Sequence, residues 1–428
     1  MSSYGFKAGA ASAILPLEAG LPLGGYLADR REAVAPNSSL SVRSVVLASG
    51  DVRVAIVVFD LLYAGAGLTS RLRELLEERL GMPAHRVLVA GTHTHCGPRD
   101  ITLESGPELV EALAEAGFGV VAEAISRLAP ARVLSDVLSG VAIGRSRRDP
   151  DASVDHDAQL VVVQGTDGSV VATLVNLACH PVVLDDAWHR YDPDFVGPLR
   201  SLVEDAIGGI CVFLQGFAGD VNPVRVESSP REARRVGMGA AGLIVGRIAE
   251  VTATDRDAGV INLSLDAVVP VALRQAAVHS GPLTAASVVV QATRRRGAVE
   301  RGPGATPTAI AMEEWITGLR EQRDSVFNSM ELGASDIPLE VQVIGVGDSL
   351  RLVAFPGEPL GALRAGVTAR FPGAHVLTVG YSNGAPGYLP DRAAFANSGY
   401  EVGCSIVAPD TAERLIAAIP DPAAGGAG

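Results

Sequence analysis

The strongest constraint on the fold is a regular alternation of apolar, β-branched runs with amphipathic helical segments. The run "VRVAIVVFD" at 52–60 is bounded by Gly and Asp, which is typical of a buried strand. In "LTSRLRELLEERLGMP", at 68–83, four leucines fall on one helical face, and Ser70 and Gly81 are predicted to cap the helix. The next run, "RVLVAGT" at 86–92, is again strand-like. A strand, a helix and a strand joined by short links form a βαβ unit, so we expect a parallel pair of strands.

The same alternation extends over most of the chain. Further helices are expected at 108–128, 196–207, 231–251 and 360–371, and further strands at 158–165, 169–179, 209–216, 337–357 and 374–382. The turn signals "TDG" and Gly347-Asp348 indicate two hairpins among them. The pattern predicts the α/β class, with a mixed, largely parallel sheet and flanking helices.

Residues 1–420 are expected to form a single α/β domain. Within it the pattern is less clear over 256–337, which we interpret as an inserted subregion with one amphipathic helix at 309–325. The tail at 421–428, "DPAAGGAG", is expected to be disordered.

Composition excludes several classes of function. The chain has 428 residues and a formal net charge of −13, which argues against nucleic acid or an anionic membrane as a partner. The longest apolar runs, such as "ICVFLQGFAG", are far shorter than the ~18–20 residues of a membrane span. The opening stretch is a poor secretory signal, and the four cysteines have no CxxC spacing. We therefore expect a cytoplasmic protein with free thiols.

Polar side chains that can bind metals or move protons follow five of the apolar runs. In open α/β sheets the functional crevice lies beyond the carboxyl ends of the strands. The residues found there are His93, His95, His180, Asp220, Asn222, Glu358, Tyr381, Asn383 and Tyr388. Two or three histidines with a glutamate suit Zn²⁺, with one position left open for water. The sequence therefore predicts a zinc site at the carboxyl ends of the strands.

Each of these residues also has a purely structural interpretation. His93 and His95 could be a chance pair, and His180 could simply bond a backbone carbonyl. Asp220 could cap a turn, and Glu358 could be stabilised by a helix dipole. Together these interpretations require five coincidences at one end of one sheet, so we favour the metal site.

A series of motifs resembles the catalytic domain of the neutral/alkaline (non-lysosomal) ceramidase family. The motifs are, in order, "GTHTHCGP", "NLACHPVVL", "FLQGFAGDVNP", "FPGEP", "GYSNGAPGYLP" and "GYEVG". The opening "LPLGGYLADR" and "SVRSVVLASGDVRVAIVVFDLL" are also similar. The resemblance covers nearly the whole chain, except that the chain lacks the C-terminal β-sandwich of that family.

The resemblance implies a zinc amidohydrolase and assigns its residues. Zinc would be held by His93, His180, Glu358 and Tyr388. The implied catalytic helpers are His95, Tyr400 and an arginine of "IGRSRRDP", which is Arg147 or, as the alternative, Arg145. The family carries serine where this chain has Asn222. The motifs name no particular substrate, and ceramide itself is not indicated.

The expected reaction is attack of zinc-bound hydroxide on an amide carbonyl of a small molecule. His95 would move the proton, while Tyr400 and Arg147 would stabilise the tetrahedral intermediate. Asn222 would donate a hydrogen bond to the oxyanion, and Asp220 would orient a ligand histidine.

Two other functions remain open at this stage. One is a lactonase, cyclase or acyl transferase that uses zinc as a Lewis acid, so an ester substrate is also allowed. The other is a non-catalytic binding protein of the same fold. The sequence leaves the oligomeric state open.

Overall fold

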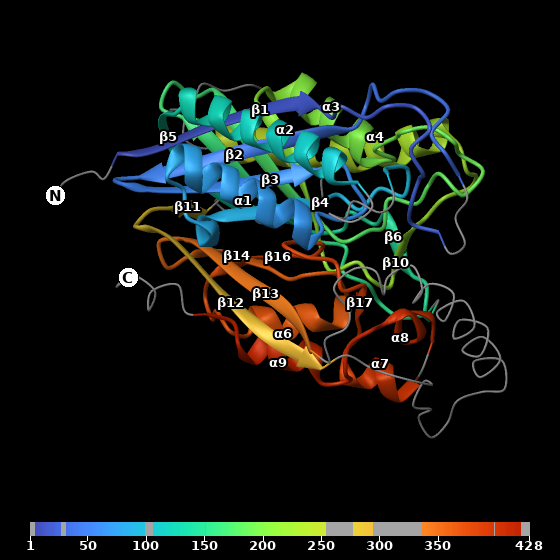
Figure 1. Ribbon diagram of the computed structural model, residues 1–428. Helices are drawn as coiled ribbons and strands as arrows, with labels where there is room; N and C mark the ends of the chain where they lie inside the picture. Colours follow the sequence, from blue (N-terminus) through green and yellow to red (C-terminus); the bar gives the residue numbers. More distant parts are fainter. Residues whose placement is uncertain are drawn as a thin grey trace, which may run out of the picture.

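The computed structural model describes residues 5–26, 31–98, 106–149, 151–253, 277–293, 336–397 and 399–420 (Figure 1). The helix expected at 309–325 and the tail at 421–428 lie outside the described residues, as does most of the subregion 256–337. Among the described residues no helix is long and apolar enough to cross a membrane.

The strands of the first half of the chain build one large mixed sheet. Their order is β4-β3-β2-β1-β5-β7-β8-β9, and β11 pairs with β5 beside this path. The bounds are β1 Phe6–Ile14, β2 Ser41–Ser49, β3 Val52–Phe59, β4 Val87–Gly91, β5 Ala129–Leu138, β7 Ala158–Gly165, β8 Val170–Leu177, β9 Ile210–Gln215 and β11 Ala277–His279. The hairpin expected at "TDG" is confirmed, because β7 and β8 pair antiparallel across it.

A second, four-stranded sheet follows, in the order β12-β13-β14-β16. Its strands are β12 Leu283–Thr293, β13 Asp336–Val346, β14 Leu350–Ala354 and β16 His375–Val379. The hairpin expected at Gly347 is confirmed by the antiparallel pairing of β13 and β14. Two short pairs complete the strands, β6 Gly144–Ser146 with β10 Val221–Pro223, and β15 Glu358–Pro359 with β17 Tyr388–Leu389.

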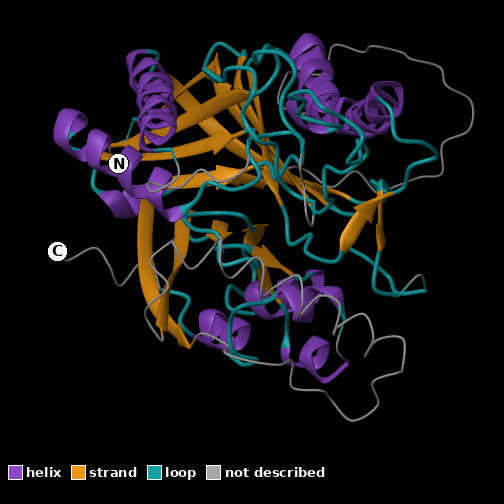
Figure 2. Ribbon diagram, turned by 45° about the vertical axis from the view of Figure 1, so that its right-hand side comes forward, coloured by secondary structure: helices purple, strands orange, loops and turns teal. Residues whose placement is uncertain are grey.

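Helices cover the outer faces of the two sheets, as Figure 2 shows. On the large sheet these are α1 Ala66–Leu80, α2 Pro107–Ser126, α3 Val196–Ile207 and α4 Pro230–Ala253. Shorter helical segments follow: η1 Ala84–Arg86, η2 Gly361–Leu363, α6 Arg364–Thr368, α7 Arg392–Asn397, α8 Tyr400–Cys404 and α9 Thr411–Ala417. Helix α1 begins at Ala66, so the expected cap at Ser70 is wrong, whereas Gly81 adopts the left-handed conformation expected of a C-cap.

The two sheets pack face to face over a shared core. On the large sheet Ile56 and Val58 of β3 point into it, and Leu352 and Leu377 of β14 and β16 meet them from the second sheet. All four side chains are almost completely buried. Burial of each such side chain contributes roughly 1.5–3 kcal/mol, so this interface is a main source of stability. The described part of the molecule therefore has four layers: helices, large sheet, second sheet, helices.

The expected α/β class with a mixed sheet and flanking helices is confirmed, but the expectation of a largely parallel sheet is corrected. Among the described strands, parallel pairing is confined to β3–β4, β8–β9 and β14–β16, besides the two-residue pair β15–β17. Each of the first three pairs encloses a helical crossover, which parallel strands require. The other pairs are antiparallel, because hairpins and longer returns join their strands.

The sheets meet by main-chain hydrogen bonds at the carboxyl ends of these parallel pairs. After β16, Gly380 donates its N–H to the carbonyl of Gln215 in β9, at 2.9 Å. The carbonyl of Tyr381 accepts from Gly91, and the N–H of Asn383 donates to Val89 of β4. The ends of β4, β9 and β16 are thereby held at one edge, although they belong to two sheets and not, as the sequence analysis assumed, to one.

Candidate metal centre

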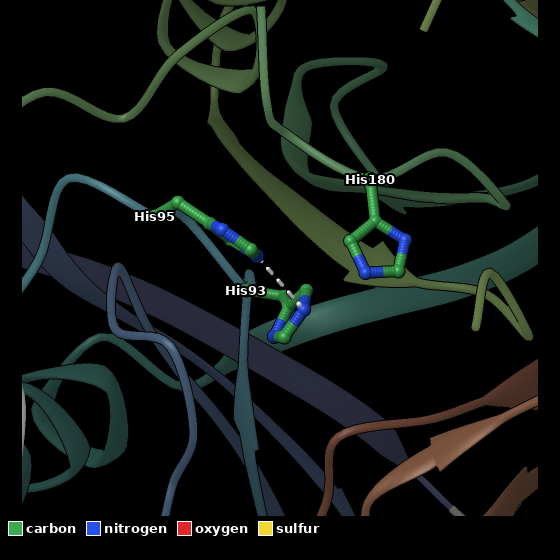
Figure 3. Close-up of side chains that lie close together, drawn as sticks. All are labelled: His93, His95 and His180. Carbon is green, nitrogen blue, oxygen red and sulfur yellow. Dashed lines mark hydrogen bonds between the residues drawn. The ribbon is translucent and has the colours of Figure 1, made fainter. Parts of the chain in front are cut away.

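His93 and His95 lie in the loop that leaves β4. The backbone of His93 has a φ of 68°, which is left-handed and uncommon for a residue with a side chain. Its N–H donates to the carbonyl of Leu61, and its Nδ1 lies 2.9 Å from the carbonyl of Leu62. These bonds turn the Nε2 atom of His93 toward His95, whose own Nε2 lies 3.3 Å away (Figure 3).

His180 reaches the same point from the loop after β8. Its N–H donates to the carbonyl of Val221, and its Nδ1 lies 2.7 Å from the carbonyl of Ala218. The ligand atoms of His93, His95 and His180 all lie within 4.8 Å of one another, and the three residues are buried. Figure 3 shows the three rings gathered at one place although they come from two separate loops.

Glu358 joins the histidines from β15, which follows β14 of the second sheet. Its Oε2 atom lies 3.1 Å from Nε2 of His180 and 3.4 Å from Nε2 of His93. The N–H of Glu358 donates to the carbonyl of Gly387, and β15 aligns Glu358 with Tyr388. Two imidazole nitrogens and one carboxylate oxygen thus converge, as the resemblance implied.

The protonation of these groups suits metal binding. A carbonyl oxygen can only accept, so the Nδ1 atoms of His93 and His180 must carry the hydrogen, which leaves the lone pair on Nε2. Burial lowers the pKa of His180 to about 4, so its ring is neutral at pH 7. Burial by itself raises the pKa of Glu358, but His93 and His180 outweigh it and hold that pKa well below its usual range. A neutral imidazole at His180 and an ionised carboxylate at Glu358 are the forms that bind a metal.

Arg147 forms the next part of the site with two tyrosines. Its Cζ atom lies 5.3 Å from the ring centre of Tyr388 and 5.1 Å from that of Tyr400. Its Nε donates to Glu401 at 2.8 Å, and a terminal nitrogen donates to the carbonyl of Gly219 at 2.6 Å. Arg145 is exposed, so Arg147 is the arginine that faces the site.

One expected site residue, Asp220, makes other contacts than predicted. Asp220 accepts a hydrogen bond from the N–H of Gly361, in the turn after Glu358, and the ligand histidines are oriented by backbone carbonyls instead. The expectation that Asp220 orients a histidine is therefore corrected. Asn222 lies in β10 opposite Arg145, and its Oδ1 is buried with no hydrogen-bond partner among the described residues.

Three tyrosines border the centre, of which only Tyr381 is among the candidates that follow the apolar runs, without an assigned role. The hydroxyl of Tyr63 makes a short hydrogen bond to Oε1 of Glu358. The ring of Tyr381 lies 4.2 Å from that of His93, and the ring of Tyr26 lies 4.9 Å from that of His95. Tyr63 follows β3 as closely as His95 follows β4. Its position after an apolar run is therefore the signal by which the sequence could have indicated it.

No protein-family model matches the chain, and no curated protein matches it in sequence. Solved structures do match in fold. A ceramidase complexed with C2 superposes with a TM-score of 0.76 at 17% identity, covering 98% of this chain and 75% of that chain. Neutral ceramidase from Pseudomonas aeruginosa gives a TM-score of 0.76 at 17% identity, with 99% and 74% covered. The resemblance seen in the sequence motifs is thus confirmed by the structure: this chain has the ceramidase fold along nearly its whole length.

Proposed function

We propose that the protein is a zinc-dependent hydrolase that cleaves the amide bond of an N-acyl small molecule. The observation that carries this proposal is the meeting of three buried residues, His93, His180 and Glu358: Oε2 of Glu358 lies 3.1 Å from Nε2 of His180 and 3.4 Å from Nε2 of His93. The fold of the ceramidases, which are amide hydrolases by their name, supports the reaction class.

The ligand set consists of His93, His180 and Glu358, with Tyr388 beside Glu358 in the pair of β15 and β17. This donor set of nitrogen and carboxylate oxygen suits zinc. When bound there, a zinc ion would lower the pKa of a water molecule and polarise a carbonyl oxygen.

His95 is suited to move a proton. In the two proposed ligand histidines a backbone carbonyl accepts a hydrogen bond from Nδ1. The Nδ1 atom of His95, in contrast, is buried and has no hydrogen-bond partner among the described residues. Its tautomer is therefore not imposed by the backbone. Burial lowers the pKa of His95 well below the usual value, so the ring is neutral at pH 7 and keeps one nitrogen unprotonated. Gly25 makes room for it, because a Cβ there would lie 2.4 Å from the His95 ring.

Arg147 and Tyr400 supply positive charge and a hydroxyl where the substrate oxygen becomes negative. Glu401 and the carbonyl of Gly219 hold the guanidinium in place before substrate binds. Such preorganised donors stabilise an oxyanion without a cost of reorganisation during the reaction.

Three alanine variants test the proposal, each measured for zinc content and for turnover of a panel of N-acyl compounds. His93→Ala and His180→Ala should each lose zinc and turnover. His95→Ala should keep about one zinc per chain and lose turnover by roughly 10²–10⁴-fold, the usual contribution of a general acid–base. Hydrolysis in ¹⁸O-labelled water should place the label in the carboxylate product.

Full zinc content in His180→Ala would overturn the ligand assignment. A product without the ¹⁸O label would exclude hydrolysis. Loss of zinc in His95→Ala, with retention in His93→Ala, would exchange the roles of these two histidines.

A further inference from the structure

The loop between β3 and α1 forms one wall of the candidate metal centre. Three consecutive residues of it touch the centre: the carbonyls of Leu61 and Leu62 bind His93, and the side chain of Tyr63 binds Glu358. The resemblance that identified the ligands assigned no role to this loop. Its contacts reach ligands from both sheets, since His93 follows β4 and Glu358 follows β14.

The two oxygens of Glu358 have different partners. Oε1 accepts the hydroxyl hydrogen of Tyr63, whereas Oε2 faces the Nε2 atoms of His93 and His180. A hydrogen bond from a hydroxyl to a carboxylate is charge-assisted and therefore strong. With Oε1 engaged by Tyr63, the carboxylate presents a single oxygen to the histidines.

We propose that Tyr63 is a positioning residue of the metal centre, which holds Glu358 as a ligand through one oxygen and so sets the affinity for the metal. This inference rests on the proposed zinc site. It adds to that site a residue whose hydroxyl acts through Glu358.

The packing around Tyr63 keeps its hydroxyl at Glu358. Its ring stacks on Tyr381 with centres 6.3 Å apart and planes 24° apart, and it lies 5.2 Å from the ring of His93. Gly91 lets the loop approach β4, because a Cβ on Gly91 would lie 3.2 Å from Cα of Tyr63. A ring bounded in this way has few other positions for its hydroxyl.

Loss of the hydroxyl has two consequences for Glu358. Its Oε1 becomes a buried carboxylate oxygen without this donor, which is unfavourable. The carboxylate is also freed to rotate or to offer both oxygens to a metal. Removing such a partner of a ligand typically costs 10–100-fold in metal affinity.

The test compares Tyr63→Phe with Tyr191→Phe. Each variant removes one phenol hydroxyl that makes a hydrogen bond, but the hydroxyl of Tyr191 donates to the carbonyl of Glu18 and not to a residue of the candidate metal centre. Zinc affinity is measured on the purified, folded proteins by competition with a chromophoric chelator. Tyr63→Phe should bind zinc 10–100-fold more weakly than the wild type, and Tyr191→Phe should bind it as tightly as the wild type.

The visible spectrum after cobalt(II) substitution gives a second readout, because it reports the coordination of the metal and not the stability of the fold. It should change in Tyr63→Phe and stay unchanged in Tyr191→Phe. If Tyr63→Phe does not fold, Tyr63→Leu takes its place in both measurements.

Wild-type affinity and an unchanged cobalt spectrum in Tyr63→Phe would reduce Tyr63 to a packing residue and overturn the inference. Equal losses in both variants would also overturn it, since loss of a buried phenol hydroxyl outside the centre would then have the same effect. A wild-type protein that binds no zinc would instead refute the proposed function itself, so the two failures are distinguishable.

Discussion

At the scale of single residues, backbone conformation decides what the histidine pair can do. His93 and His95 are two residues apart, so on an extended strand both would face the same side. The left-handed φ of His93 ends the strand and directs each ring separately. His93 is then oriented by the carbonyl of Leu62, whereas Nδ1 of His95 has no partner among the described residues. This difference, which spacing cannot show, supports the proposed roles of His93 as a ligand and of His95 as a proton carrier.

Asn222 provides a prediction at the same scale. The zinc site supplies its own nucleophile in the proposed reaction, so no side chain has to form an acyl intermediate. Asn222→Ser should therefore keep measurable activity. Asn222→Ala should retain zinc and lose turnover by up to 10²–10³-fold, as expected for one oxyanion donor.

Intact-protein mass spectrometry during turnover should detect no acyl adduct. An adduct on any residue would exclude direct attack by water, and wild-type turnover in Asn222→Ala would leave this residue a structural role in β10.

At the scale of elements, a buried ion pair connects helix α3 to the strands that carry the histidine loop. Both terminal nitrogens of Arg200 lie 2.7 Å from the carboxylate of Asp60, just after β3. The same carboxylate accepts from the side chains of Thr92, beside His93, and Ser41 at the start of β2. Arg200 and Asp60 are 3% and 0% exposed, so neither charge is solvated. The pair and its hydrogen bonds therefore join α3, β2 and the segments after β3 and β4 at the edge where the candidate metal centre lies.

Removal of one partner from this pair should be costly. Arg200→Met leaves the carboxylate of Asp60 buried without its counter-charge, and the free energy of unfolding should fall by about 3–5 kcal/mol in urea denaturation. The double variant Arg200→Met with Asp60→Asn removes the charge as well, so it should regain part of this loss. Equal destabilisation in the single and double variants would show that packing around Arg200, and not the unpaired charge, is responsible.

At the scale of the whole molecule, a polar cluster joins the two sheets in addition to the main-chain hydrogen bonds that follow β16. The hydroxyl of Ser135 in β5 lies within hydrogen-bond distance of His279 in β11 and of His375 at the start of β16. Nδ1 of His279 in turn lies 2.8 Å from the hydroxyl of Ser349, in the turn before β14. The cluster therefore bridges the large sheet and the second sheet.

This bridge predicts a loss of stability in mild acid. Burial lowers the pKa of both His279 and His375 to about 4, from an ordinary value near 6.5. Between these values the unfolded chain binds more protons than the folded one, so stability falls as the pH falls from 6.5 to 4 and levels off below 4. The combined loss should be on the order of 3 kcal/mol, after allowance for partial exposure of His375. Urea unfolding at stepped pH measures it. The double variant His279→Gln with His375→Gln should show a shallower decline over this window, and an unchanged slope would refute the assignment.

The sequence by itself determined the local elements and most of the proposed ligands. Periodicity within a helix or a strand depends on neighbours in the chain, so α1, α3 and the hairpin of β7 and β8 could be read directly. The motifs pointed to His93, His180 and Glu358, because a metal site needs particular residue types. A single tyrosine after a strand is not by itself typical of a metal site, so the motifs did not predict the role of Tyr63.

Only the tertiary structure decided how these pieces combine. Strand pairing and layer packing join residues far apart in the chain, and local patterns do not specify which strands become neighbours. The mostly antiparallel large sheet, the second sheet facing it, and the role of Asp220 beside Gly361 therefore had to be observed. The same holds for the bond between Tyr63 and Glu358, whose partners lie 295 residues apart and meet only because the ends of β3 and β14 reach one edge.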